Sequence, residues 1–210
     1  MTAATDYTSP SVQFFGSVND HNLFTKDAHN LINILGKKQL NTLEKTSLLD
    51  IFLSKGNVVE PHYHQNAAEL VYCISGRITV SLLNPFTREL LTYSASPGEV
   101  VNIPQGWWHY EVADEDYTHL LAIFDAPNPE VILGSDILTF TPSDVMAHTY
   151  CMNENQWNAV TSNVKPATYI GPPNHCNTQN RNHYTAEQSY YYYSPPYCHI
   201  SPYHYGYYGR

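Results

Sequence analysis

Two short stretches of the chain place three histidines and one glutamate where they can bind a single metal ion. His62 and His64 are two positions apart, Glu69 follows a short linker, and His109 ends a second stretch that begins at Gly98. Because side chains alternate along a strand, His62 and His64 should point to the same face. Imidazoles and a carboxylate suit a divalent ion such as Mn, Fe, Ni, Cu or Zn. The sequence therefore predicts a metal site with coordination positions left for water or substrate.

The connections between these ligands consist of turn-forming residues. Residues 65–68 (Gln-Asn-Ala-Ala) form a short link that should carry Glu69 to a neighbouring strand. Pro104 and Gly106 turn the chain again just before His109. The spacing therefore predicts that the four ligands converge from several strands.

The pattern resembles the two signature motifs of the cupin superfamily, Gly-x5-His-x-His-x3,4-Glu-x6-Gly and Gly-x5-Pro-x-Gly-x2-His-x3-Asn. The first motif is complete from Gly56 to Gly76, and the second matches from Gly98 through His109 but has Ala113 in place of Asn. Residues 56 to about 150 also resemble a single-domain relative of the oxalate decarboxylase group. The resemblance implies a small antiparallel β-barrel with one divalent metal ion inside its mouth, for which we expect Mn or Fe.

Two departures from the oxalate-processing relatives concern the substrate. Those relatives hold the substrate carboxylate with an Arg three residues before the first ligand His, where this chain has Val59. Their Ser-Glu-Asn-Ser-type lid loop is also missing, and the shorter stretch 126–130 offers Glu130 as its single lid acid. Binding oxalate without an Arg in an acidic protein is unfavourable. We therefore expect a different small organic acid or oxygenated molecule as the substrate.

Further side chains near His109 are candidates for the pocket. Of Trp107 and Trp108, one should flank the metal and the other should pack outward. Glu111 shares the face of His109 in a regular strand, which would make it an inward carboxylate for proton transfer. The alternative is an exposed glutamate beside the acidic turn 114–116. We expect His119 to be structural or on the surface rather than a fifth ligand.

Short apolar runs separated by turn residues predict an all-β fold, a cupin β-barrel of the double-stranded β-helix or jelly-roll type. The expected strands are 31–35, 47–53, about 58–64, 68–75, 77–83, 89–94, 100–103, 107–112 and 118–125. After Pro129 we expect a short helical segment, capped by Thr141 or Ser143, that packs against the outside of the barrel. The domains would be an N-terminal arm (1–25), the cupin domain (26–165) and a tail (166–210).

Composition limits the classes of molecule that the chain can bind. The chain has 10 Lys and Arg against 19 Asp and Glu, a formal net charge of −9. An acidic chain without a basic run argues against nucleic acid and anionic membranes, and no apolar stretch reaches the length of a membrane span. The first residues lack the pattern of a signal peptide, and the four cysteines show no disulfide or zinc spacing, so we expect cytoplasmic synthesis. We also expect a small-molecule substrate and a homo-oligomer.

The tail from residue 166 differs sharply in composition. It contains 11 of the 18 tyrosines and 6 of the 14 prolines, and its large aliphatic residues are Ile170 and Ile200. Such a segment should be disordered and dispensable for folding. Its Tyr/His/Pro-rich composition resembles that of bacterial spore coat proteins, which implies contacts with coat proteins and a location in the spore coat.

These observations leave three interpretations of function. The first is an Mn- or Fe-dependent enzyme acting on a small organic acid or oxygenated molecule, in which the metal serves as Lewis acid or O2 platform. The second is a non-catalytic coat protein that uses the barrel as a scaffold and the Tyr-rich tail for cross-linking. The third is a cupin that binds a small ligand without turning it over.

Overall fold

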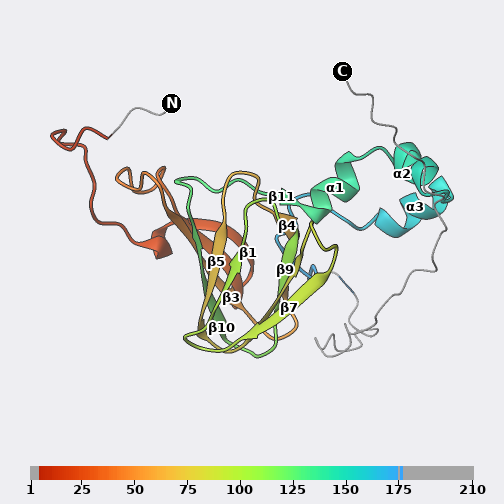
Figure 1. Cartoon of the computed structure of the whole chain (residues 1–210), viewed down its shortest axis with the longest axis horizontal. Coiled ribbons are helices and arrows are strands. Elements are labelled where there is room, and N and C mark those ends of the chain that lie inside the picture. Colours follow the sequence, from red (N-terminus) through yellow and green to blue (C-terminus); the bar gives the residue numbers. More distant parts are fainter. Residues whose placement is uncertain (1–4, 175, 177–210) are drawn as a thin grey trace, which may run out of the picture.

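A computed structural model describes residues 5–174 and residue 176. Two antiparallel sheets, drawn in Figure 1, form a barrel. One sheet has the order β1-β2-β3-β10-β5-β8, and the other has the order β11-β4-β9-β6-β7 with β12 also paired to β4. The strands are β1 (Asn22–Asp27), β2 (Asn30–Leu35), β3 (Ser47–Leu53), β4 (Val58–Tyr63), β5 (Glu69–Ser75), β6 (Ile78–Leu83), β7 (Leu90–Ala95), β8 (Val100–Ile103), β9 (His109–Ala113), β10 (Thr118–Phe124), β11 (Ile132–Leu133) and β12 (Ile170–Gly171).

The all-β architecture predicted from the sequence is confirmed, and each of the nine expected strands is present with ends shifted by no more than two residues. Three strands were not expected. β1 has the polar sequence Asn-Leu-Phe-Thr-Lys-Asp, lies at a sheet edge and crosses the boundary expected between the N-terminal arm and the cupin domain. β11 and β12 contain two residues each, which is too short for a periodic pattern.

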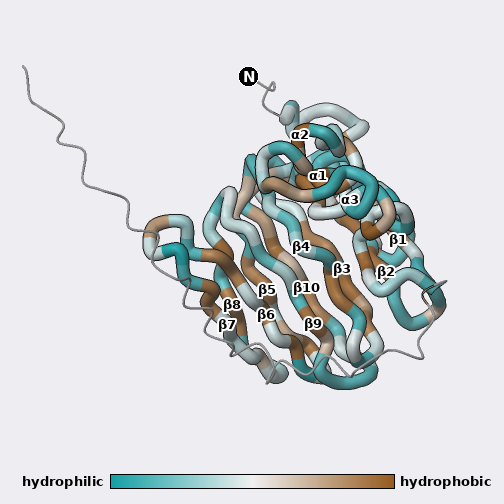
Figure 2. Tube along the Cα trace, turned by 90° about the vertical axis from the view of Figure 1, so that its right-hand side faces the viewer, coloured by the Kyte–Doolittle hydropathy of each residue, from teal (hydrophilic) through white to brown (hydrophobic). Residues whose placement is uncertain are grey.

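Strict alternation of side chains fills the space between the sheets. Along β10 the residues Thr118, Leu120, Ala122 and Phe124 are buried, while the intervening residues are partly exposed. Figure 2 shows the same outcome at the level of hydropathy, with apolar residues along the strands and polar residues in many of the turns. Cys73 of β5 is fully buried in this core.

Three α-helices, α1 (Gly134–Phe140), α2 (Ser143–Thr149) and α3 (Glu154–Thr161), follow β11, and a short 3-10 helix (Val18–Asp20) precedes β1. α1 contacts β4 and β11, whereas α2 and α3 pack on each other and extend away from the barrel (Figure 1). The expected packing on the barrel therefore holds for α1 alone. Among the described residues, no helix combines the length and apolar character needed to cross a bilayer.

The predicted helix cap is wrong. Thr141 ends α1, and the residue that caps the start of α2 is Pro142, which offers no side-chain hydrogen bond. Ser143 is already the first residue of α2, and its hydroxyl donates to Glu154 instead. Pro142 precedes the helix at a position where its missing N–H costs no helical hydrogen bond.

The boundary predicted after residue 165 is also wrong. Ile170 is 1% exposed and belongs to the main apolar core, and β12 pairs with Val58 and Val59 of β4. Tyr169 packs against the same core. Ile170, together with the pairing of β12 to β4, therefore ties this segment to the barrel. The expectations of disorder, cross-linking and coat location concern residues 177–210, which lie outside the described residues.

Candidate metal centre

The four predicted ligands converge inside the barrel. His62 lies on β4, His64 directly follows it, and Glu69 and His109 are the first residues of β5 and β9. One ligand atom from each of the four lies within 4.8 Å of all the others. The Oε2 atom of Glu69 is 3.0 Å from Nε2 of His109 and 3.2 Å from Nε2 of His64. All four side chains are buried, so the cluster is shielded from bulk water.

Strand register produces this convergence. His62 lies directly opposite His109 in the β4–β9 pair, and their ring centroids are 4.0 Å apart. A register shift between Val59 and His62 adjusts the β4 pleat just before the ligands. The link 65–68 then carries the chain from β4 to β5 in the other sheet, as predicted, so Glu69 closes the set from the opposite wall.

Backbone carbonyl groups orient all three imidazoles. A carbonyl oxygen only accepts hydrogen bonds, so each contacted Nδ1 carries a proton, and Nε2 is the atom through which each neutral ring could bind a metal ion. The contacts are His62 Nδ1 to Glu60 O at 2.6 Å, His64 Nδ1 to Glu130 O at 2.8 Å and His109 Nδ1 to Trp107 O at 2.8 Å. This fixed tautomer is the one that a metal ligand requires.

One observation tests whether a metal fits. Among the described residues, the buried side-chain atoms without a hydrogen-bond partner are Nε2 of His64 and Oε2 of Glu111. An unpartnered buried acceptor is costly and uncommon in native structures. A divalent ion bound by three Nε2 atoms and one carboxylate would satisfy His64, so the residues present fit the implied ion.

The electrostatics of the metal-free cluster favour a cation. Burial lowers the pKa of His62 to about 3, with the charge of His109 adding to the effect. Burial raises the pKa of Glu69, but the hydrogen bond with His109 and the nearby imidazole of His64 outweigh it and hold this pKa well below its usual range. Burial lowers the pKa of His109, but its hydrogen bond with Glu69 outweighs that and raises it to about 9. The anionic Glu69 therefore holds a proton on His109 where a metal ion would otherwise lie.

Glu111 points into the barrel, so the exposed alternative is wrong. It is 2% exposed, and its Oε1 atom lies 3.7 Å from Nε2 of His109. Burial and the nearby charge of Glu69 raise the pKa of Glu111 to about 8. Val59 faces Glu111 across the β4–β9 pair and is itself buried in the core. A protonatable carboxylate thus lies next to the ligands, beside an apolar side chain.

The other predicted residues are more peripheral. Glu130 is exposed, its carboxylate accepts a hydrogen bond from Gln65, and its contribution to the cluster is the carbonyl that orients His64. Trp107 packs against the apolar core, whereas Trp108 lies near Tyr63, whose ring centroid is 6.3 Å away. The two tryptophans therefore have different surroundings, and the prediction that one of them flanks the metal stays a prediction.

Sequence reasoning missed the role of Glu60. Its buried carboxylate accepts hydrogen bonds from the amide and hydroxyl of Ser135 at 2.8 and 3.0 Å and from the amide of Tyr169 at 2.7 Å. Its carbonyl meanwhile orients His62. The one local signal was an acidic residue within an otherwise apolar strand, directly before Pro61.

A two-sheet antiparallel barrel with three imidazoles and one carboxylate in its interior defines a class of metal-site β-barrels. The model of the Cupin family matches residues 19–158, and the chain therefore belongs to the cupin family.

Relatives agree with this assignment. The chain is 29% identical over 128 residues to Germin-like protein 1-2 of Oryza sativa subsp. japonica, covering 59% of this chain and 56% of the relative. It is 25% identical over 171 residues to Nectarin-1 of Nicotiana langsdorffii x Nicotiana sanderae, covering 78% and 71% respectively. The chain thus spans little more than half of the germin-like relative.

Solved structures show the same fold. Coconut allergen cocosin aligns with a TM-score of 0.67 at 21% identity, covering 76% of this chain and 43% of that chain. Oxalate decarboxylase from Bacillus subtilis aligns with a TM-score of 0.65 at 22% identity, covering 74% and 40% respectively. The chain spans less than half of either structure.

Proposed function

We propose that this protein is an enzyme that uses one bound Mn or Fe ion to act on a small organic acid or other oxygenated molecule. The observation that carries the proposal is the pairing of an oriented three-histidine, one-glutamate cluster with Glu111, a buried carboxylate whose Oε2 atom has no partner. A site built for stability alone gains nothing from a second, unpartnered carboxylate, because its burial is costly.

The roles of the residues follow from their positions. His62, His64, Glu69 and His109 would hold the ion, and the ion would supply Lewis-acid or O2-binding chemistry when bound. Glu111 would hold or accept a proton at Oε2 close to these ligands. Glu130 acts through its carbonyl, which fixes the ring of His64.

Donor chemistry and one similar structure support Mn or Fe. Three imidazoles and one carboxylate suit first-row divalent ions that keep open positions. Bacillus subtilis oxalate decarboxylase, whose structure is similar to that of this chain, has Mn(II) centers. Zn, Ni and Cu remain alternatives for metal analysis to decide.

Oxalate is not the substrate that we propose. Val59 stands where oxalate-processing relatives carry an arginine, and it is buried beside Glu111. Among the described residues, no buried side chain is a lysine or arginine that could pair with a dianion. A substrate with at most one carboxylate suits this interior better.

Elemental analysis and a substrate panel test the proposal. After growth in medium with added Mn and Fe, the wild type should contain about one metal ion per chain, and His64→Ala should lose it, since each ligand contributes to affinity. Glu111→Gln should retain the metal but turn over the active substrate about 100-fold more slowly, followed by product formation and O2 uptake. A metal-free wild type, or a fully active Glu111→Gln variant, would contradict the proposal.

The alternative is a non-catalytic coat protein that uses the barrel as a scaffold and cross-links through its tail. Its support is the tyrosine-rich composition of residues 177–210, outside the described part of the chain. Stoichiometric metal without turnover of any substrate, together with cross-linking by peroxidase and peroxide, would favour this alternative.

A further inference from the structure

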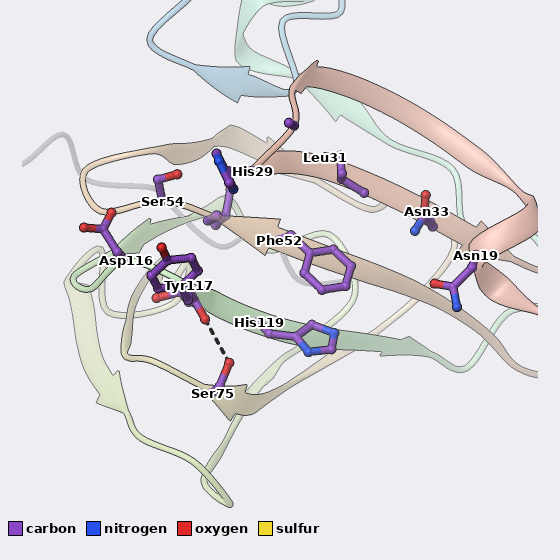
Figure 3. Close-up of a pocket in the computed structure, with 13 residues that line it drawn as sticks. Asn19, His29, Leu31, Asn33, Phe52, Ser54, Ser75, Asp116, Tyr117 and His119 are labelled. Atoms are coloured by element: carbon purple, nitrogen blue, oxygen red, sulfur yellow. Dashed lines mark hydrogen bonds between the residues drawn. The ribbon is translucent and has the colours of Figure 1, made fainter.

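A groove of about 710 Å³, drawn in Figure 3, lies on the outer face of the sheet that contains β3 and β10. None of the predicted metal ligands lines it. Ser75, which lines the groove, ends β5, whereas the ligand Glu69 begins it. His119 lies near the start of β10, whereas Phe124, which contacts His64, ends it. At about 3.3 Å per residue, the six positions along β5 separate the two places by roughly 20 Å.

An oriented imidazole lies in the groove. His119 points outward from β10, and its Nε2 atom is 2.6 Å from Oδ1 of Asp50 on β3. Its ring stacks on Phe52 with a centroid distance of 4.2 Å and an interplanar angle of 17°. In the neutral ring, Nε2 donates to Asp50, so Nδ1 carries a lone pair. Among the described residues, no partner is found for this Nδ1, so it is free to accept a hydrogen bond from a ligand.

Tyr117 forms one end of the groove in a strained conformation. Its φ is +60°, which is uncommon for a bulky residue, and its side chain is 81% exposed. The carbonyl of Tyr117 accepts a hydrogen bond of 2.8 Å from the hydroxyl of Ser75, which is the dashed contact in Figure 3. The ring of Tyr117 contacts the ring of His29 edge-on, with a centroid distance of 6.4 Å. The turn thus holds a large aromatic ring in water at an energetic cost, and such strain is often found at functional sites.

The charge of the groove selects the ligand. Asp116 is exposed at the same end, and no lysine or arginine is among the lining residues. The chain as a whole has a formal charge of −9. The groove therefore offers acceptors and aromatic faces: the His119 lone pair, the Asp116 carboxylate and the Tyr117 ring. These groups complement a hydrogen-bond donor with positive charge and an apolar body.

We propose that this groove is a second binding site, distinct from the metal centre, for a small primary ammonium ligand with an aromatic or similarly apolar body. The ammonium group would lie beside the carboxylate of Asp116 and the ring of Tyr117, at one end of the groove (Figure 3). The apolar body would lie against Phe52 and Leu31, which line the same groove. This site goes beyond the proposed metal-dependent reaction and does not depend on it.

Calorimetric titration of the full chain with three matched probes tests the ligand class. The probes are 2-phenylethylamine, its neutral counterpart 2-phenylethanol and the anion phenylacetate, in near-neutral buffer where the amine is protonated. The amine should bind at least about fivefold more tightly than the alcohol, because the charge adds a cation–π and carboxylate attraction, and phenylacetate should not bind. Equal binding of amine and alcohol, or no binding of the amine, would overturn the proposal.

Variants locate the site without disturbing the fold. Tyr117→Asn keeps a residue that tolerates positive φ but removes the ring, so amine affinity should fall about fivefold while the thermal midpoint is kept. Asp116→Asn should weaken the amine about two- to fivefold and leave the alcohol unchanged. Tyr93→Asn is the control, because Tyr93 is a half-exposed tyrosine on β7 of the other sheet. Loss of affinity in the control, or none in Tyr117→Asn, would place the site elsewhere.

Discussion

A single glutamate connects the metal ligands to the far end of the described chain. The carboxylate of Glu60 receives donors from the start of α1 and from the residue before β12, while its carbonyl fixes His62. Burying an ionised carboxylate is expensive unless several donors surround it. Three hydrogen bonds from Ser135 and Tyr169 supply that compensation. Glu60 therefore acts as a positioning residue rather than as a ligand.

Glu60→Gln should destabilise the fold. The amide group of glutamine would present its own N–H donors to the donors of Ser135 and Tyr169, so at least one buried donor would lose its acceptor at a cost of about 2 kcal/mol. For a chain of this size the thermal midpoint should fall by roughly 4–8 °C, measured by circular dichroism.

Glu130→Gln is the matched control. Glu130 also lends a carbonyl to a ligand histidine, but its carboxylate is exposed and bonded to Gln65. Its substitution should shift the midpoint by no more than about 2 °C, as surface changes usually do. Similar shifts of the thermal midpoint in both variants would show that the buried hydrogen bonds of Glu60 do not stabilise the fold more than the surface contacts of Glu130 do.

The contrast between Glu60 and the metal ligands shows what the sequence can predict. His62, His64 and Glu69 lie within eight positions of one another, so strand alternation and one turn suffice to predict their convergence. The partners of Glu60 lie 75 and 109 positions away and depend on how α1 and β12 dock. No local periodicity encodes such a contact, so it became visible only in the folded chain.

At the scale of elements, tight turns set the register of the barrel. Gly56, Gly76, Gly98 and Gly106 all adopt positive φ, the backbone region that favours glycine. Gly76 has a second constraint, since a Cβ there would lie 2.5 Å from Oγ1 and 2.7 Å from Cα of Thr118. Nothing lies within 4 Å of a Cβ at Gly98. The two glycines therefore share backbone strain but differ in packing.

Substituting alanine at each position separates these effects. Gly98→Ala should cost about 1 kcal/mol through positive φ alone. Gly76→Ala should cost at least about 2 kcal/mol more, because the clash involves the backbone of Thr118 at the start of β10. Urea unfolding monitored by fluorescence provides both values. Equal destabilisation would mean that the β5–β6 turn can shift away from Thr118 without penalty.

Element existence was predictable where a strand is long and alternates, as in β5 and β10. How the elements pack on one another was harder to predict from the sequence. One short helical segment was expected after Pro129, but three helices follow β11, and α2 and α3 pack on each other rather than on the barrel. Composition alone also favoured disorder for the segment after residue 165, since it could not show that Ile170 faces an open edge of β4.

At the scale of the whole molecule, the last described segment packs against the first strand, β1. The ring of Tyr169 lies 5.2 Å from that of Phe24 on β1, and the amide of Asn174 donates to the carbonyl of Lys26. Ile170 completes the apolar core from the same segment. Residues 169–174 thus close the structure across a separation of 148 positions along the chain.

Truncation tests whether this closing segment belongs to the domain. A chain ending at Lys165 loses the buried Ile170 and the hydrogen bond from the amide of Tyr169 to Glu60. We expect its free energy of unfolding to fall by about 3 kcal/mol, which corresponds to roughly 6–12 °C in the thermal midpoint. A chain ending at Cys176 keeps every described contact of the segment, so its midpoint should stay within about 2 °C of the full chain. Ile170→Ala in the full chain isolates the core contribution and should lie between the two. Equal midpoints for the chains ending at Lys165 and Cys176 would show that β12 is an appendage, and that Glu60 and the metal cluster are held in place without it.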